Sequence, residues 1–425
     1  MLKRKGIFTR LTAILLMLIM LTGCSEKATS PDEKGAEGGE IVVAARAGSM
    51  SDALETLAAE YEENTGVKVK ITALPYDSLK EKVVLDVRNN SGAYDLVMMD
   101  DPWMPEFGES GLLLSLDDYF KDGVDSDFIK KSVDLCRVPY ASGSLYALPL
   151  VGNVQMFFYR KDLFEKYSLD EPATWDQVLE ASRVITEKEP DTFGYVLRGQ
   201  RGNPVVANYI PLFWAYGGKV LDEDMKPQVN SEAGIKSMEM YLNLKETGPK
   251  GVETFDSDQI ATALTQGTAA MTIAWPSWVS KVDNEESSKV VGKIEFSAVP
   301  GAVNDSSAMI GNWLLGIPKT SKNADLAVEF LKWVTGKDAE KKMALAGGGV
   351  PTRISLYEDE DLIEKYRHFP AQLDALQHSV ARPRTPLWSK VEDTWGLYLS
   401  LIVSGEMEIK EGLDKANEEI EKIMQ

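Results

Sequence analysis

The chain has 425 residues, of which 44% are hydrophobic, and it carries a formal net charge of −20 at pH 7. This acidity argues against a nucleic-acid partner, because no basic surface is available to displace the counterions of phosphates. The length exceeds what one hydrophobic core usually serves, so we expect two lobes.

The first 23 residues have the layout of a secretory signal. Four basic residues, the last of them Arg10, precede an apolar stretch at 11–21 that is too short to span a bilayer. The stretch ends in Leu-Thr-Gly-Cys, which resembles a lipobox, the bacterial lipoprotein signal. This resemblance implies that Cys24 is acylated and becomes the mature N-terminus. The alternative is an ordinary signal peptide with an accidental cysteine.

Residues 24–40 are predicted to form a flexible tether. They are rich in Gly, Ser, Pro and charge and have no apolar periodicity, so a folded body could move ~20–25 Å from its anchor. Removal of residues 1–23 takes away four positive charges and no negative ones, which lowers the formal charge from −20 to −24. Such a charge disfavours adhesion to anionic lipids, so the lipid on Cys24 is the membrane contact that we predict.

Strands and helices alternate after the tether. The sequence predicts a buried strand at 40–46, an alternating strand at 67–74 and a third strand at 94–100. Helices are predicted at 50–66, from its helical apolar spacing, and at 76–89. This alternation implies a parallel, helix-covered sheet, in which ligands meet the loops at the carboxyl ends of strands. Those loops are 47–50 and 100–103.

A second α/β region begins near residue 157, and the C-terminal third is mostly helical. The second region is predicted to contain helices at 174–188, 205–216, 231–248 and 257–267 and strands at 269–275 and 293–299. Helical patterns in the last third occupy 324–347, 387–405 and 409–424. The predicted fold class is therefore α/β.

Catalytic signatures are scarce. The sequence has no G-x-S-x-G elbow, no phosphate-binding loop and no G-x-G-x-x-G fingerprint. His368 and His378 have no cysteine or carboxylate at metal-ligand spacing, so we expect no metal and no cofactor.

Asp100 and Asp101 suggest a glycosidase pair, but consecutive residues of an extended chain point to opposite sides, which favours a binding or capping role. Cys136 is expected to be a buried small hydrophobic residue, with a catalytic nucleophile as the alternative.

Tryptophans provide the more specific chemistry. Indole faces can stack on the C–H faces of a sugar ring while amides and carboxylates take its hydroxyls. A core position is the better interpretation for the three that lie inside amphipathic helices: Trp175, Trp333 and Trp395. A core position and a stacking platform are both open for four others near predicted strand or helix ends: Trp103, Trp275, Trp278 and Trp313.

Seven segments carry a family resemblance. In chain order they are YDLVMMDDPWMPEFGESGLL (94–113), 143–182, FWAYGG (213–218), QGTAAMTIAWPSW (266–278), 311–334, VPTR (350–353) and ARPRTP (381–386). In order and spacing they resemble the maltose-binding-like group of extracellular solute-binding proteins, which serve carbohydrate importers of the ATP-binding-cassette (ABC) type. The resemblance covers nearly everything from residue 40 to the end.

This resemblance implies a two-lobed periplasmic-binding-protein fold of type II, with two α/β lobes joined by three hinge crossings and a ligand between them. Carried onto this chain, the crossings fall near 151–157, 309–315 and 346–351. The lobes implied are 41–152 with 313–347, and 156–310 with 350–425.

The resemblance also implies ligand contacts. They are Gly48, Ser49, Asp100, Asp101, Trp103, Asn153, Trp275, Trp278, Gly311, Asn312, Trp313, Arg382 and Arg384. The two arginines could hold vicinal hydroxyls or a sugar carboxylate bidentately, or they could be ion-paired to carboxylates across the lobes. Asn153 stands where maltose-type members often have an acidic residue, so maltodextrin is not the expected ligand.

The predicted function is therefore that of a lipid-anchored, extracytoplasmic substrate-binding component of an ABC importer at the cell membrane. As a monomer, it would capture a mono- or oligosaccharide by hinge closure and pass it to the permease subunits without catalysis. Two alternatives remain at this point: a surface glycoside-processing enzyme using Asp100 or Asp101, and a binder of polyols or acidic sugars.

Overall fold

The computed structural model describes residues 38–425. The predicted signal, Cys24 and most of the predicted tether lie outside the described residues. Within the described part of the chain, no helix has the length and apolar character needed to cross a membrane.

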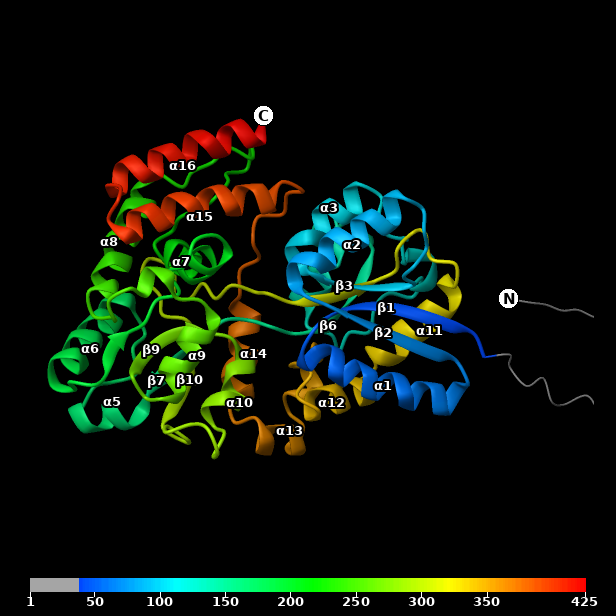
Figure 1. Cartoon of the computed structure of the whole chain (residues 1–425), viewed down its shortest axis with the longest axis horizontal. Helices are drawn as coiled ribbons and strands as arrows, with labels where there is room; N and C mark the ends of the chain where they lie inside the picture. The colour runs from blue at the N-terminus through cyan, green and yellow to red at the C-terminus, as the bar shows by residue number, and fades with distance from the viewer. Residues whose placement is uncertain (1–37) are drawn as a thin grey trace, which may run out of the picture. The chain divides into compact units, whose positions relative to one another are not determined.

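The first of two large sheets has five strands in the order β2-β1-β3-β11-β6 (Figure 1). Its strands are β1 (Glu40–Arg46), β2 (Lys68–Leu74), β3 (Leu96–Asp100), β6 (Ala147–Val151) and β11 (Trp313–Gly316). β1 is parallel to β2 and β3, whereas β11 is antiparallel to both β3 and β6. The predicted parallel sheet is thus confirmed for the first three strands and wrong for the sheet as a whole, because β11 enters it from the C-terminal half of the chain.

Helices cover both faces of this sheet, which explains why all five residues of β3 are buried. The helices are α1 (Ser49–Thr65), α2 (Tyr76–Arg88), α3 (Met104–Glu109), α4 (Lys130–Leu135), α11 (Ala324–Val334) and α12 (Lys337–Leu345). Figure 1 shows α2 and α3 on one face and α1 and α12 on the other. α1 is capped by Gly66, whose φ of 73° is the left-handed conformation that glycine adopts readily at the end of a helix. We call this sheet and its helices the first lobe.

The second sheet has the order β10-β7-β9-β8. Its strands are β7 (Met156–Arg160), β8 (Phe193–Tyr195), β9 (Ala269–Ala274) and β10 (Ile294–Ser297). Its helices are α5 (Lys161–Tyr167), α6 (Trp175–Lys188), α7 (Asn203–Ala215), α8 (Glu232–Lys245), α9 (Ser257–Thr265), α10 (Val279–Val282), α14 (Phe369–His378), α15 (Trp388–Ser404) and α16 (Ile409–Met424). We call this sheet and its helices the second lobe.

The core of the second lobe includes α15, which packs on both α7 and α16 (Figure 1). Trp175 and Trp395 are at most 1% exposed, so their predicted core positions are confirmed. Trp333 of the first lobe is only partly buried, but it packs against the core beside Tyr61 and Phe330.

Short elements complete the chain. They are the paired strands β4 (Arg137–Val138) and β5 (Ser144–Leu145), the helix α13 (Glu360–Lys365), and the 3-10 turns η1 (Asp101–Trp103), η2 (Asp117–Tyr119), η3 (Val252–Thr254), η4 (Pro276–Trp278) and η5 (Ile354–Leu356). η1 follows β3 and η4 follows β9, so each places a tryptophan just beyond the carboxyl end of a strand.

The chain passes between the two lobes three times, and the passing segments are hydrogen-bonded to one another. The Gly311 N–H donates to the Asn153 carbonyl at 2.9 Å, and the Gly152 N–H donates to the Val350 carbonyl at 2.8 Å. A Cβ on Gly152 would lie 2.1 Å from the Pro351 carbonyl oxygen, so only glycine permits this close approach. The first crossing is therefore hydrogen-bonded to both of the others, and the three crossings together join the two lobes.

Candidate ligand-binding site

A cavity of about 760 Å³ lies between the lobes, above the crossings, and we call it the main cavity. Its volume falls within the range of ordinary small-molecule sites, roughly 300–1,000 Å³. The carboxyl ends of β1, β3 and β9 supply Arg46, Asp100 and Trp275 to its wall, and β11 begins with Trp313 at the same place. Of the two loops predicted from strand order, 100–103 thus lines the main cavity, whereas 47–50 does not.

Aromatic rings form one side of the main cavity. Trp103 lies 5.2 Å from Tyr76 and 6.1 Å from Trp313 between ring centroids, and the Trp103–Trp313 pair is close to perpendicular. Trp275 comes from the second lobe and lies against Gly311, where a Cβ would be only 2.7 Å from the indole. Three tryptophans from two lobes therefore line the same space, and each offers an apolar surface suited to sugar or polyol carbons.

A buried ion-pair cluster forms the floor of the main cavity. Arg382 donates to Asp100 Oδ1 at 2.9 Å and to Asp101 Oδ2 at 2.8 Å, and Arg384 donates to Asp101 Oδ1 at 3.0 Å. Of these four residues, Asp100 and Arg382 line the cavity, whereas Asp101 and Arg384 do not. Both arginines are thus paired with carboxylates, and Arg382 also lines the main cavity.

Asp100 is held from two sides. The Tyr76 hydroxyl donates to its Oδ2 at 2.9 Å, while Arg382 bonds its Oδ1. Burial, followed by the nearby Asp100 charge, raises the pKa of Tyr76, which keeps the phenol protonated as a donor. A carboxylate has about four acceptor positions, so Asp100 retains capacity for a ligand hydroxyl.

Further polar groups come from the second lobe. Arg198 donates to Asp256 Oδ1 at 2.7 Å, and Asn203 donates to Glu392 Oε1 at 3.0 Å. Glu392 on α15 is 9% exposed, and burial raises its pKa to about 7 although Arg382 opposes the rise. Glu392 is thus partly protonated near neutral pH and can donate as well as accept a hydrogen bond.

Sequence reasoning missed these neighbours of the predicted residues. Arg46 and Tyr76 follow or end predicted strands, so the rule that ligands meet the carboxyl ends of strands could have identified them. Glu392 carries no such local signal, because it lies inside a helix and reaches the main cavity only through the packing of α15 near η1.

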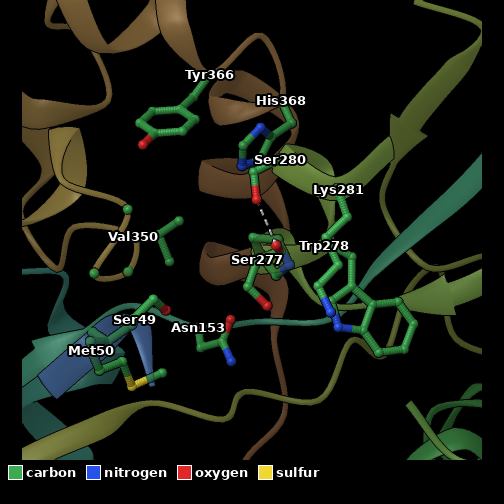
Figure 2. A pocket seen from close by; sticks show the side chains of 15 residues that line it. Ser49, Met50, Asn153, Ser277, Trp278, Ser280, Lys281, Val350, Tyr366 and His368 are labelled. Carbon is green, nitrogen blue, oxygen red and sulfur yellow. Dashed lines mark hydrogen bonds between the residues drawn. The ribbon is translucent and has the colours of Figure 1, made fainter. Parts of the chain in front are cut away.

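A second cavity of about 370 Å³ adjoins the main one, and we call it the side cavity (Figure 2). Asn153 and Ser277 line both cavities. Ser49 and Trp278 line only the side cavity, so the structure separates Trp278 from Trp103, Trp275 and Trp313.

The other predicted contacts lie elsewhere. Gly48 is exposed at the start of α1, and Asn312 is fully buried with its Nδ2 donating to Ser132 Oγ at 2.6 Å. Neither residue lines the two cavities, whereas Gly311 lines the main one. Arg384 lines a different surface cavity beside Trp214.

No metal centre is found in the described part of the chain, where no group of three or more His, Cys, Asp or Glu side chains could hold an ion. Cys136 is fully buried and its thiol donates to the Ser132 carbonyl at 3.4 Å. Burial raises the pKa of Cys136, so the thiolate needed for nucleophilic attack is disfavoured.

A sequence model of the bacterial extracellular solute-binding proteins matches residues 47–341. The chain belongs to this family. A probable amino-acid ABC transporter periplasmic-binding protein of Sinorhizobium fredii is 27% identical over 397 residues, which cover 89% of this chain and 88% of that protein. A mannitol-binding protein of Pseudomonas aeruginosa is 27% identical over 307 residues, or 70% of each chain.

The fold of this solute-binding protein also has a close experimental counterpart. The crystal structure of an ABC transporter solute-binding protein from Agrobacterium radiobacter, in complex with ribitol, matches it with a TM-score of 0.82 and 27% identity. The match covers 92% of this chain and 100% of the other. The predicted family and two-lobed α/β fold are thereby confirmed, and the family is one of transporter binding proteins rather than enzymes.

Proposed function

We propose that this protein captures a neutral sugar or polyol in the main cavity and presents it to an ABC importer. The observation that carries the proposal is the meeting, in one cavity, of indole rings from both lobes with the Asp100–Arg382 pair. Apolar ring faces and a hydrogen-bonding floor are the two features needed to hold a polyhydroxylated carbon chain.

Hinge closure accounts for capture. A ligand that bridges Trp103 and Trp313 of the first lobe and Trp275 of the second makes all of these contacts only when the lobes are close together. It therefore shifts the equilibrium toward the closed form by its differential affinity for that form. The proposed lobes are residues 41–152 with 313–347, and 156–310 with 350–425, because the three crossings separate the two sheets near these limits.

Polyols are favoured by two relatives, one named as a mannitol-binding protein and the other crystallised in complex with ribitol. A third relative is named for amino acids. An amino acid presents an ammonium and a carboxylate that need free counter-charges, whereas Asp100 and Asp256 are already bonded to arginines. At these two positions a ligand hydroxyl therefore fits better than an ammonium group.

The proposed ligand contacts are the predicted residues that line the main cavity: Asp100, Trp103, Asn153, Trp275, Gly311, Trp313 and Arg382. Tyr76, Glu392 and Asn203 are added to them, because their polar groups lie in the same wall. Asp101 and Arg384 are assigned a supporting role, since Asp101 accepts a hydrogen bond from Arg382 and is itself bonded by Arg384, and neither lines the cavity.

The anchor completes the proposed function. Acylation of Cys24 would hold the protein, as a monomer, at the outer face of the cell membrane, and the tether at 24–40 would let it move between solution and permease. The support for this part is the sequence pattern together with membership of an extracellular family.

A thermal-shift screen of the protein lacking residues 1–23 tests the proposal. Mannitol, ribitol, glucose, maltose, glucuronate and a set of amino acids are compared at saturating concentration. A ligand that binds only the folded state raises the melting temperature, so polyols or sugars are expected to do so and amino acids are not. A shift produced by amino acids alone would overturn the carbohydrate assignment.

A further inference from the structure

The side cavity is accessible and is built by both lobes. Ser49 of the first lobe and Ser277, Ser280 and Lys281 of the second lobe are all exposed residues in its lining, so the space is not a sealed core void. Its volume of about 370 Å³ is itself within the range of a ligand site.

The side cavity adjoins the main cavity. Asn153, in the first crossing, and Ser277, in η4, belong to the walls of both. In Figure 2 the side chains of Ser49, Asn153 and Ser277 gather at one end of the side cavity, and those of Tyr366 and His368 lie at the other. The two cavities therefore meet at Asn153 and Ser277.

The lining of the side cavity suits a neutral, hydroxylated group with an apolar face. It contains serine hydroxyls, the Asn153 amide, the Trp278 indole and the Tyr366 phenol, and it contains no carboxylate. Trp278 is 6% exposed, so only a small part of its surface faces the space. The main cavity, by contrast, has four carboxylates in its wall.

The His368 side chain lines the side cavity as an uncharged imidazole near neutral pH. It is 2% exposed, lies 5.7 Å from Phe296 and 5.2 Å from Phe369 between ring centroids, and burial lowers its pKa to about 3. Lys281 is thus the one charged side chain among the lining residues of the side cavity near neutral pH.

Building on the function proposed above, we propose that the natural ligand is a neutral carbohydrate of at least two units, such as a disaccharide or a glycosylated polyol. One unit lies in the main cavity between Trp103, Trp313 and Trp275, and the next passes between Asn153 and Ser277 to rest against Trp278. A single polyol occupies the main cavity alone and leaves the side-cavity contacts unmade.

Calorimetric titrations with ligands that differ by one unit test this proposal. The pairs are glucitol with maltitol, and glucose with maltose, cellobiose and gentiobiose. For the wild-type protein, at least one two-unit ligand is expected to bind tenfold or more tightly than its one-unit counterpart. Equal affinities throughout, with one-unit ligands bound, would overturn the inference and leave the proposed function intact.

A cavity-filling variant provides the structural control. Ser280→Phe places a ring in the side cavity only, so it is expected to reduce the ratio of two-unit to one-unit affinity at least tenfold. Ser287→Phe is the matched control, because Ser287 is exposed and lies outside both cavities. If Ser280→Phe does not fold, Ser49→Trp fills the same space from the first lobe.

The remaining outcomes are also decisive. A folded Ser280→Phe or Ser49→Trp variant that keeps the wild-type affinity ratio would show that the second unit lies elsewhere. A wild-type protein that binds none of the carbohydrates would overturn the proposed function, and this inference with it.

Discussion

Arg382 donates from Nη2 to Asp100 Oδ1 across 2.9 Å, joining the segment after α14 to the carboxyl end of β3. The two residues are 282 positions apart in the chain, and both are at least 90% buried. The pair links the two lobes and at the same time forms the floor of the main cavity. Its integrity should therefore affect both stability and binding.

Replacement of Arg382 by Met is expected to destabilise the protein by about 3–5 kcal/mol, because it leaves buried carboxylates without their guanidinium partner. Urea unfolding followed by fluorescence measures the loss. Lys236→Met is the control: Lys236 pairs with Glu232 on the exposed face of α8, so its removal should leave the unfolding midpoint nearly unchanged. Equal effects of the two substitutions would contradict the role given to Arg382.

Replacement of Trp275 by Ala is expected to weaken binding of the ligand found in the screen by about 2 kcal/mol, or roughly thirtyfold, because a central aromatic contact is lost. Calorimetry measures the affinity. Trp175→Ala is the matched control, since Trp175 is 1% exposed and lines neither cavity. The control should lose about 3–5 kcal/mol of folding stability, while its folded fraction keeps wild-type affinity.

The raised pKa of Glu392 should make the free energy of unfolding depend on pH. Its folded-state pKa of about 7 lies above the ordinary value of 4.5, so the folded protein holds this proton more tightly than the unfolded chain does. The stability contribution of Glu392 is fully present below pH 4.5 and is lost as pH rises through 7. Relative to Glu392→Gln, the wild-type protein should therefore lose on the order of 3 kcal/mol of unfolding free energy between pH 4.5 and 7.5. Urea titrations at both pH values test this, and a constant difference would contradict it.

Replacement of Cys24 by Ser is expected to release the protein into the medium or to leave its signal uncleaved, because no lipid can then be attached. Fractionation of cells into membranes and medium measures the change. A wild-type protein found wholly in the medium without proteolytic shedding would contradict the proposed anchor.

Local pattern alone was enough to predict most of the elements. β1 spans the predicted 40–46, α16 spans the predicted 409–424, and α1 begins one residue before the predicted helix and ends one residue before its predicted end. These predictions succeed because helical and strand periodicities depend on neighbours a few residues apart. The buried positions of Trp175 and Trp395 followed from the same helical periodicity.

Only the tertiary structure decided how the candidate site is put together. The antiparallel entry of β11, the Arg382–Asp100 pair and the place of Glu392 in the cavity wall all depend on segments that are hundreds of residues apart in the chain or in separate elements. Trp275 and Trp278 illustrate the limit most closely, since they are three residues apart and yet line different cavities. The turn of η4 points the two indoles in different directions. The cavity that each indole lines depends on the residues that the first lobe packs opposite it, and no local sequence pattern encodes that contact.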